Sequence, residues 1–278
     1  MEFSDISEYY DVHARSWATQ YDVKAQTMHS PVRDRTKTVS GLRTLRASEE
    51  MVLEIAAALD AHRIFDLGCG FASSLLYMAN IKPEIIYSGI CASDTEMELA
   101  RERIRDAGRV QTVSVFRGDF EDGRNYRVFP AQDIVFALDS WHHARQPQKT
   151  LNLLASLVRP GGRLVVVDWF RVSDGDDLRP GELACLDQWQ DAAGLPAIQD
   201  LSAFHAASDE AGFARVSDRP LGEDVALSGI AAMAMKLASP LVGGLDKATR
   251  QVWQARLAAE QARRKGLLDY RAIELIRP

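Results

Sequence analysis

Short apolar runs alternate with amphipathic segments along the chain from position 63 onward. The segment 93–107, where Met97, Ala100 and Ile104 keep helical spacing, predicts a helix. Strands that alternate with helices favour right-handed βαβ units and a parallel sheet covered on both faces. The pattern therefore predicts an α/β, Rossmann-like, doubly wound fold. Its strands are expected at 64–67, 85–90, 112–116, 133–138, 163–168 and 213–217, and its other core helices at 75–79 and 148–158.

The most informative stretch follows the first predicted strand and reads Ile64-Phe-Asp-Leu-Gly-Cys-Gly-Phe-Ala-Ser-Ser74. Gly68 and Gly70 lack a Cβ, so the backbone turns sharply there and approaches a ligand closely. The helix that begins just beyond offers free N–H groups. This geometry predicts a nucleotide or nucleoside crevice at the carboxyl end of the first strand.

The residues around this turn decide between kinds of nucleotide. A dinucleotide site requires a third glycine where Ser73 stands, and an acid at the end of the second strand, where the chain has Ile90-Cys91-Ala92. A phosphate loop requires Gly-Lys-Ser/Thr, which the sequence lacks. An acid before Gly-x-Gly suits a nucleoside that bears an amino acid, because the Asp66 carboxylate can orient an ammonium group.

The turn resembles motif I of the class I S-adenosylmethionine (SAM) methyltransferases. The similarity is close across 63–170 and includes Val158-Arg-Pro-Gly-Gly162, Gly118-Asp119 and the pair His142-His143. Gly89-Ile-x-x-Ser93 and the ending 266–278 are similar to the subgroup of sterol, tocopherol and natural-product methyltransferases. The resemblance implies a mostly parallel seven-stranded sheet, SAM as cofactor and S-adenosylhomocysteine (SAH) as product.

The resemblance also implies which residues hold SAM. Asp66 is expected to orient the methionine end, Asp119 to hold the adenine amine, and Phe120 to stack on the ring. Asp139, after the fourth strand, is expected beside the methionine moiety. The full expected set is Tyr21, Asp66, Gly68, Cys69, Gly70, Ser93, Glu96, Asp119, Phe120 and Asp139.

Glu96 has two interpretations. Class I enzymes usually bind the ribose hydroxyls with an acid at the position that Cys91 occupies here, since a carboxylate accepts two hydrogen bonds. Ser93 and Glu96 stand where the subgroup often has Ser and Gln, so they are candidates for that contact. Ser-x-x-Glu before an apolar-periodic helix is equally a capping box, and the sequence leaves both readings open.

His142 and His143 are the catalytic candidates. Methyl transfer from an activated sulfonium mainly requires proximity and orientation, and a base when the acceptor is a hydroxyl or an acidic carbon. Histidine suits that role because its pKa lies near neutrality, and His142 is the first choice. The alternative is that one histidine only holds the loop to the next helix. Asp168 and Trp169 end the fifth strand, where they either face the crevice or only pack against neighbouring side chains.

Composition narrows the class of protein. A net charge of −6 over 278 residues, with a pI of about 5.6, argues against nucleic-acid binding. No leader or membrane span is visible, which predicts a cytoplasmic protein, and the spacing of Cys69, Cys91 and Cys185 suits no metal. We expect a small-molecule acceptor and a monomer or homodimer.

Two regions lie outside the predicted sheet core. Residues 1–59 are expected to form a helical lid, followed by a methyltransferase domain at 60–278 with substrate-cap insertions at 171–201 and 221–265. Within the cap, 226–242 is nearly all apolar and predicts a buried helix or a wall of an acceptor pocket. The basic stretch 33–46 either binds an anionic acceptor or is a solvated helix face.

The sequence thus predicts a methyltransferase that modifies C, O or N of a small, hydrophobic metabolite of natural-product or prenyl type. Two alternatives stay open. One is a SAM-fold cyclase, or another non-methylating enzyme that uses the cap pocket. The other is a non-catalytic partner or regulator, which the intact Asp66, Gly68, Gly70 and Asp119 argue against.

Overall fold

The computed structural model describes residues 6–11, 14, 30, 32–33, 43–44, 46–172, 178–225 and 247–278. The predicted Tyr21 contact and the apolar segment 226–242 lie outside these residues, as does most of the basic stretch 33–46.

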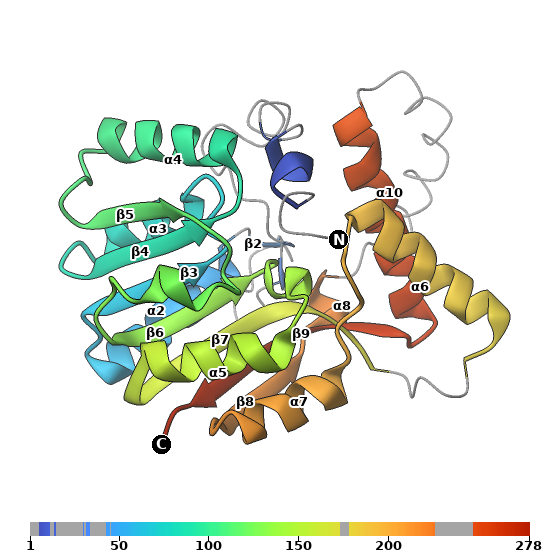
Figure 1. Ribbon diagram of the computed structural model, residues 1–278. Helices are drawn as coiled ribbons and strands as arrows, with labels where there is room; N and C mark the ends of the chain where they lie inside the picture. Colours follow the sequence, from blue (N-terminus) through green and yellow to red (C-terminus); the bar gives the residue numbers. More distant parts are fainter. Residues whose placement is uncertain are drawn as a thin grey trace.

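A seven-stranded sheet in the order β5-β4-β3-β6-β7-β9-β8 forms the centre of the molecule (Figure 1). Strands β3, β4, β5, β6 and β7 are parallel to one another, whereas β9 runs antiparallel between β7 and β8. From β3 the chain adds β4 and β5 on one side and then returns to add β6 and β7 on the other side. This reversal of the strand order beside β3 confirms the predicted doubly wound sheet. The bounds are β3 Arg63–Leu67, β4 Ile86–Cys91, β5 Val113–Arg117, β6 Gln132–Leu138, β7 Val158–Arg171, β8 Ala214–Pro220 and β9 Leu268–Ile276.

Helices cover both faces of the sheet because successive strand residues point to opposite sides. On β6, Ile134 and Phe136 belong to one apolar cluster, whereas Val135 and Ala137 belong to another. The first cluster is closed by α2 Ala47–Leu59, α3 Ser73–Ile81 and α4 Asp94–Asp106, and the second by α5 Pro147–Leu157 and α7 Leu201–Glu210.

The predicted strands and core helices are present, with bounds that differ by a few residues. The helix expected at 148–158 begins instead at Pro147, whose fixed φ suits the first helical turn, and ends at Leu157. The expectation of an all-helical segment 1–59 was wrong in part. Residues 6–11 and α2 are helical, but β1 Val32–Arg33 pairs antiparallel with β2 Arg43–Thr44.

The two segments predicted to form the cap contain α6 Pro180–Ala193 and α10 Lys247–Arg264, which pack side by side beyond one end of the sheet (Figure 1). Cys185, Leu186 and Trp189 of α6 meet Ala258 and Ala262 of α10 in a third apolar cluster. The short helix α8 Gly222–Val225 follows β8. The division into lid and methyltransferase domain stays a prediction.

Candidate active site

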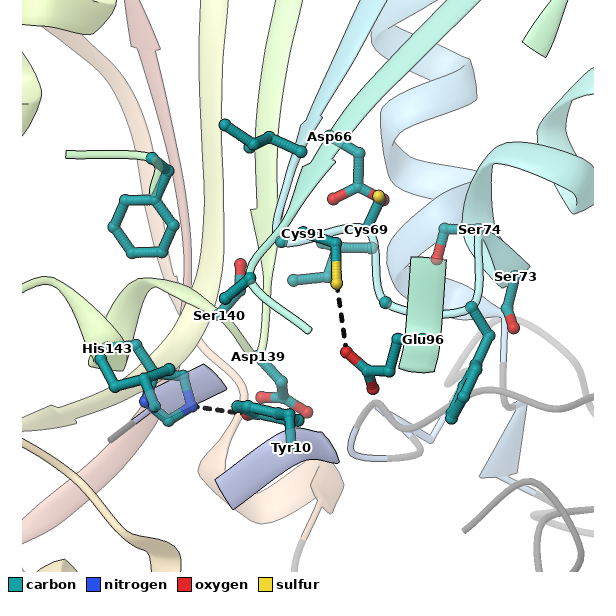
Figure 2. Close-up of a pocket in the computed structure, with 18 of the residues that line it drawn as sticks. Tyr10, Asp66, Cys69, Ser73, Ser74, Cys91, Glu96, Asp139, Ser140 and His143 are labelled. Atoms are coloured by element: carbon teal, nitrogen blue, oxygen red, sulfur yellow. Dashed lines mark hydrogen bonds between the residues drawn. The ribbon is translucent and has the colours of Figure 1, made fainter. Parts of the chain in front are cut away.

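A pocket opens at the carboxyl ends of β3, β4 and β6, where the sheet order reverses. Ligands of open α/β sheets bind at this kind of switch point. The pocket brings together seven of the ten predicted cofactor residues: Asp66, Gly68, Cys69, Gly70, Glu96, Phe120 and Asp139 (Figure 2).

The glycine turn forms the floor of the pocket. Gly68 has φ 109° and Gly70 has φ 45°, both in the left-handed region that favours glycine. The N–H groups of Gly68 and Cys69 donate to the Ile90 carbonyl at 3.0 and 2.9 Å, so the turn is fastened to the end of β4. A Cβ on Gly68 would lie 2.5 Å from Cβ of Ser140, closer than atoms pack.

We therefore expect Gly68→Ala to lower the free energy of unfolding by about 2 kcal/mol, from backbone strain and displacement of Ser140. Thermal unfolding of the purified variant measures this loss. Gly212→Ala is the control, because it also has a positive φ, of 85°, but open space around the added Cβ. Equal losses for the two variants would show that crowding at the turn contributes nothing.

Glu96 is the most unusual group in the pocket. Its side chain is buried, and its Oε2 accepts a hydrogen bond from the Cys91 thiol at 3.2 Å (Figure 2). Its Oε1 is buried and has no hydrogen-bond partner among the residues that the structure describes. Desolvation by burial raises the pKa of Glu96 to about 7, opposed by the Cys91 hydrogen bond and helped by the Asp11 charge.

Only half of the predicted capping box is present. Ser93 is the N-cap of α4, and its hydroxyl accepts from the Glu96 N–H at 3.0 Å. The Glu96 carboxylate, however, is directed to Cys91 and the pocket. This arrangement favours the ligand-contact interpretation of Glu96.

Ser93 and Asp119 lie outside the pocket lining. The Ser93 hydroxyl is fully buried and donates to Asp11 at 2.5 Å. Asp119 is ion-paired with Arg145 and accepts from the Glu121 N–H at 2.9 Å, while its neighbours Gly118 and Phe120 do line the pocket. The predicted cofactor contacts of Ser93 and Asp119 stay predictions, with these side chains engaged elsewhere.

The two histidines have different surroundings. Nδ1 of His142 lies 2.6 Å from the buried Asp168 carboxylate, which also accepts from the His142 N–H at 3.1 Å. Although burial lowers the pKa of His142, the charge and hydrogen bond of Asp168 raise it above its ordinary value. Asp168 thus holds the ring in one orientation and fixes its tautomer.

His143 lines the pocket, and its Nε2 lies 2.6 Å from the hydroxyl of Tyr10 (Figure 2). Burial, and then the neighbouring His142, lower the pKa of His143 well below its ordinary value. The neutral His143 ring is therefore hydrogen-bonded to Tyr10, whereas the neighbouring His142 is paired with the Asp168 carboxylate.

Asp139 follows β6 directly and has φ 48°, which is rare for a residue with a side chain. Its N–H donates to the Val167 carbonyl at 3.0 Å, and one carboxylate oxygen accepts from the Ser30 N–H at 2.6 Å. Asp139 therefore links the core to the N-terminal region at the edge of the pocket.

The predicted set of cofactor residues does not include the pocket residues Ile6, Tyr10 and Ser140. Tyr10 and Asp11 belong to a Tyr-Tyr-Asp run within the region 1–59 that is predicted to form the lid, and this run was the available signal. Ser140 closes the turn by donating to the Leu67 carbonyl, a contact between residues 73 apart that no local pattern indicates.

The comparisons with known proteins agree with this geometry. Residues 65–164 match the family model described as a methyltransferase domain, a stretch that contains the glycine turn, Glu96 and both histidines. The match covers residues 65–164 of the 278 in the chain. The predicted resemblance to class I SAM-dependent methyltransferases of the small-molecule subgroup is thereby confirmed.

Two curated relatives show the level of similarity. The methyltransferase GfsG of Streptomyces halstedii is 29% identical over 126 residues, 44% of each chain. The 27-O-demethylrifamycin SV methyltransferase of Amycolatopsis mediterranei is 28% identical over 153 residues, 55% of this chain and 50% of its own. The chain thus spans about half the length of these relatives.

Solved structures confirm the fold over nearly the whole chain. The cyclopropane synthase MmaA2 from Mycobacterium tuberculosis has a TM-score of 0.73 at 14% identity, covering 99% of this chain and 98% of its own. The [4+2]-cyclase SpnF has a TM-score of 0.70 at 19% identity, covering 98% and 95%. Within the described residues, no helix has the length and apolarity needed to cross a membrane.

Proposed function

We propose that this protein transfers the methyl group of SAM to carbon, oxygen or nitrogen of a small, hydrophobic metabolite. The observation that carries the proposal is the buried, unpartnered Oε1 of Glu96 in a pocket floored by the glycine turn. A buried acceptor atom without a partner is costly, so it indicates a ligand that donates hydrogen bonds there. The ribose hydroxyls of SAM are donors of that kind.

The other pocket residues fit the remaining parts of SAM. Asp66 and Asp139 supply carboxylates for the ammonium and sulfonium charges, and the lining residues within the described part of the chain include no lysine or arginine. Phe120 is fixed by its carbonyl, which accepts from the Tyr126 hydroxyl at 2.5 Å, and offers a ring for the adenine.

When bound, SAM supplies an activated methyl group for an in-line displacement. The residues of this chain orient the two reactants and exclude water. His142 acts as the general base for an acceptor that must lose a proton, because Asp168 engages Nδ1 and leaves Nε2 for the acceptor. Asp168 stabilises the imidazolium that forms.

The acceptor class rests on the cap and the relatives. The paired helices α6 and α10 pack around a buried apolar cluster that includes Trp189, and one curated relative is named a 27-O-demethylrifamycin SV methyltransferase. We further propose that the protein works in the cytoplasm as a monomer or homodimer, without nucleic acid.

The first experiment is calorimetric titration with SAM and with SAH, followed by mass spectrometry of hydrophobic acceptors incubated with SAM. Binding of both ligands and a gain of one methyl by an acceptor supports the proposal. Absence of binding by either ligand overturns it.

A cyclase, the class of the similar SpnF structure, would give a product of unchanged mass. A product of unchanged mass would therefore favour the cyclase alternative over methyl transfer. His142 and Asp168 favour methyl transfer over cyclisation, because a pericyclic ring closure has no proton to remove.

A further inference from the structure

The helical residues 6–11 lie against one side of the candidate cofactor pocket. Ile6 and Tyr10 line it, and the Tyr10 hydroxyl lies 2.6 Å from Nε2 of His143, across the pocket from Glu96 (Figure 2). A cofactor in the pocket therefore cannot leave past this side while the segment stays in place.

Besides this contact of Tyr10, the segment is bonded to the turn between β4 and α4. Asp11 Oδ1 accepts from the Ser93 hydroxyl at 2.5 Å and from the Thr95 N–H at 2.9 Å. One helical turn earlier, the Ser7 hydroxyl donates to the Ala92 carbonyl at 3.0 Å. These contacts join residues more than 80 positions apart in sequence.

Asp11 is ionised at neutral pH. Partial burial raises its pKa, but the hydrogen bonds from Ser93 and Thr95 and the charge of Arg117 outweigh burial and lower it. Hydrogen bonds to a carboxylate are about twice as strong as neutral ones. The carboxylate also lies at the N-terminus of α4, where the helix dipole favours negative charge.

Helix α4 does not depend on Asp11 for its first cap, since Ser93 already accepts from the Glu96 N–H. The carboxylate instead adds a contact between the N-terminal segment and the turn that carries Glu96. Because the Ser93 hydroxyl both accepts from Glu96 N–H and donates to Asp11, the segment and the Glu96 backbone are joined through one side chain.

We infer that Asp11 is a positioning residue that latches residues 6–11 over the cofactor pocket, through Ser93 and the Thr95 N–H. The latch holds Ile6 and Tyr10 against the bound cofactor and slows its release. This inference rests on the proposed function, in that the pocket is taken to bind SAM and SAH.

The test compares Asp11→Ala with Asp200→Ala in the full-length protein. Asp200 is the N-cap of α7 and accepts from the Ala203 N–H at 2.9 Å. Neither Asp200 nor its bonded partners Arg171 and Ala203 are among the described residues that line the pocket. We expect Asp11→Ala to raise the dissociation constant of SAH about tenfold, the value of one charge-assisted hydrogen bond. Asp200→Ala should bind SAH as the unaltered protein does.

Two further measurements separate a latch from a general loss of structure. Hydrogen exchange should rise in residues 6–11 of Asp11→Ala and stay unchanged in β3, β4 and β6. Asp11→Asn keeps an acceptor oxygen for the Thr95 N–H, so it should restore part of the SAH affinity, and it replaces the alanine variant if that one does not fold.

The outcomes distinguish the two ideas. If the unaltered protein binds SAH and both Asp11 variants bind it as tightly as the unaltered protein does, the latch is overturned and the proposed function stands. If the unaltered protein binds neither SAM nor SAH, the proposed function fails and the latch fails with it.

Discussion

Replacing Glu96 by glutamine is expected to stabilise the cofactor-free protein at pH 8 while it weakens SAM binding. The carboxyl is buried, with a pKa of about 7 compared with an ordinary value of 4.5. At pH 8 the folded protein therefore holds an ionised carboxylate in a desolvated site. Glutamine has nearly the same shape and no charge, so the cost of desolvating the charge disappears.

The pH dependence of stability follows from the direction of this shift. Below pH 4.5 the carboxyl is protonated in both the folded and the unfolded chain, so the site carries no penalty. As the pH rises through 4.5 towards 7, the unfolded chain ionises first and the folded state loses stability. Each pKa unit corresponds to about 1.4 kcal/mol, which gives a loss of about 3 kcal/mol above pH 7.

Denaturant unfolding at pH 4.5 and pH 8 measures this difference. Glu96→Gln should match the unaltered protein at pH 4.5 and exceed it by about 3 kcal/mol at pH 8. Glu98→Gln is the control, because Glu98 lies on the same helix with its side chain exposed. A gain of the same size in Glu98→Gln would assign the effect to net charge and not to burial.

The same variant tests the ligand contact. An ionised carboxylate accepts two hydrogen bonds at once, whereas an amide has one acceptor oxygen and presents its NH₂ to a donor. We expect Glu96→Gln to raise the dissociation constant of SAM about tenfold at pH 8. A gain in stability without a loss of SAM affinity would show that Glu96 is a buried charge with no role in binding the cofactor.

The sheet was predictable because its strands depend on local patterns. Runs such as 133–138 and 163–168 are apolar throughout, as strands buried on both faces must be, and Gly68 and Gly70 mark the turn before α3. The β1–β2 pair was not predictable, because strands of two residues leave no periodicity to read.

The site was predictable only where one residue type decides the chemistry. Gly-x-Gly after an acid indicated the crevice, but the surroundings of Glu96 depend on Cys91, which comes from another element. The Asp11 contact joins positions 82 residues apart, and the pairing of His142 with Asp168 spans 26. Such contacts depend on the tertiary fold, so spacing along the chain does not reveal them.

His142→Ala is expected to reduce the rate of methyl transfer to a protonated acceptor about 10²- to 10⁴-fold, the range for loss of a general base. The binding of SAM should stay unchanged, because His142 is not among the residues that line the cofactor pocket. His205→Ala is the matched control, since His205 also pairs with an aspartate, Asp218, at 2.9 Å, and neither residue lines the pocket. An undiminished rate in His142→Ala would show that the acceptor needs no base.

The pH profile carries the sharper test. A base acts in its neutral form, so the rate should rise with pH through the pKa of His142, which Asp168 holds above the ordinary value of 6.5 against the opposing effect of burial. Asp168→Asn removes the charge, and burial then lowers the pKa. The rising limb of the profile should therefore move to lower pH while the maximal rate falls, because the imidazolium loses its counter-charge and the ring its fixed tautomer. Nitrogen-15 NMR of the His142 ring follows the same pKa without an acceptor. An unchanged pKa of His142 in Asp168→Asn would show that Asp168 does not set the basicity of this histidine.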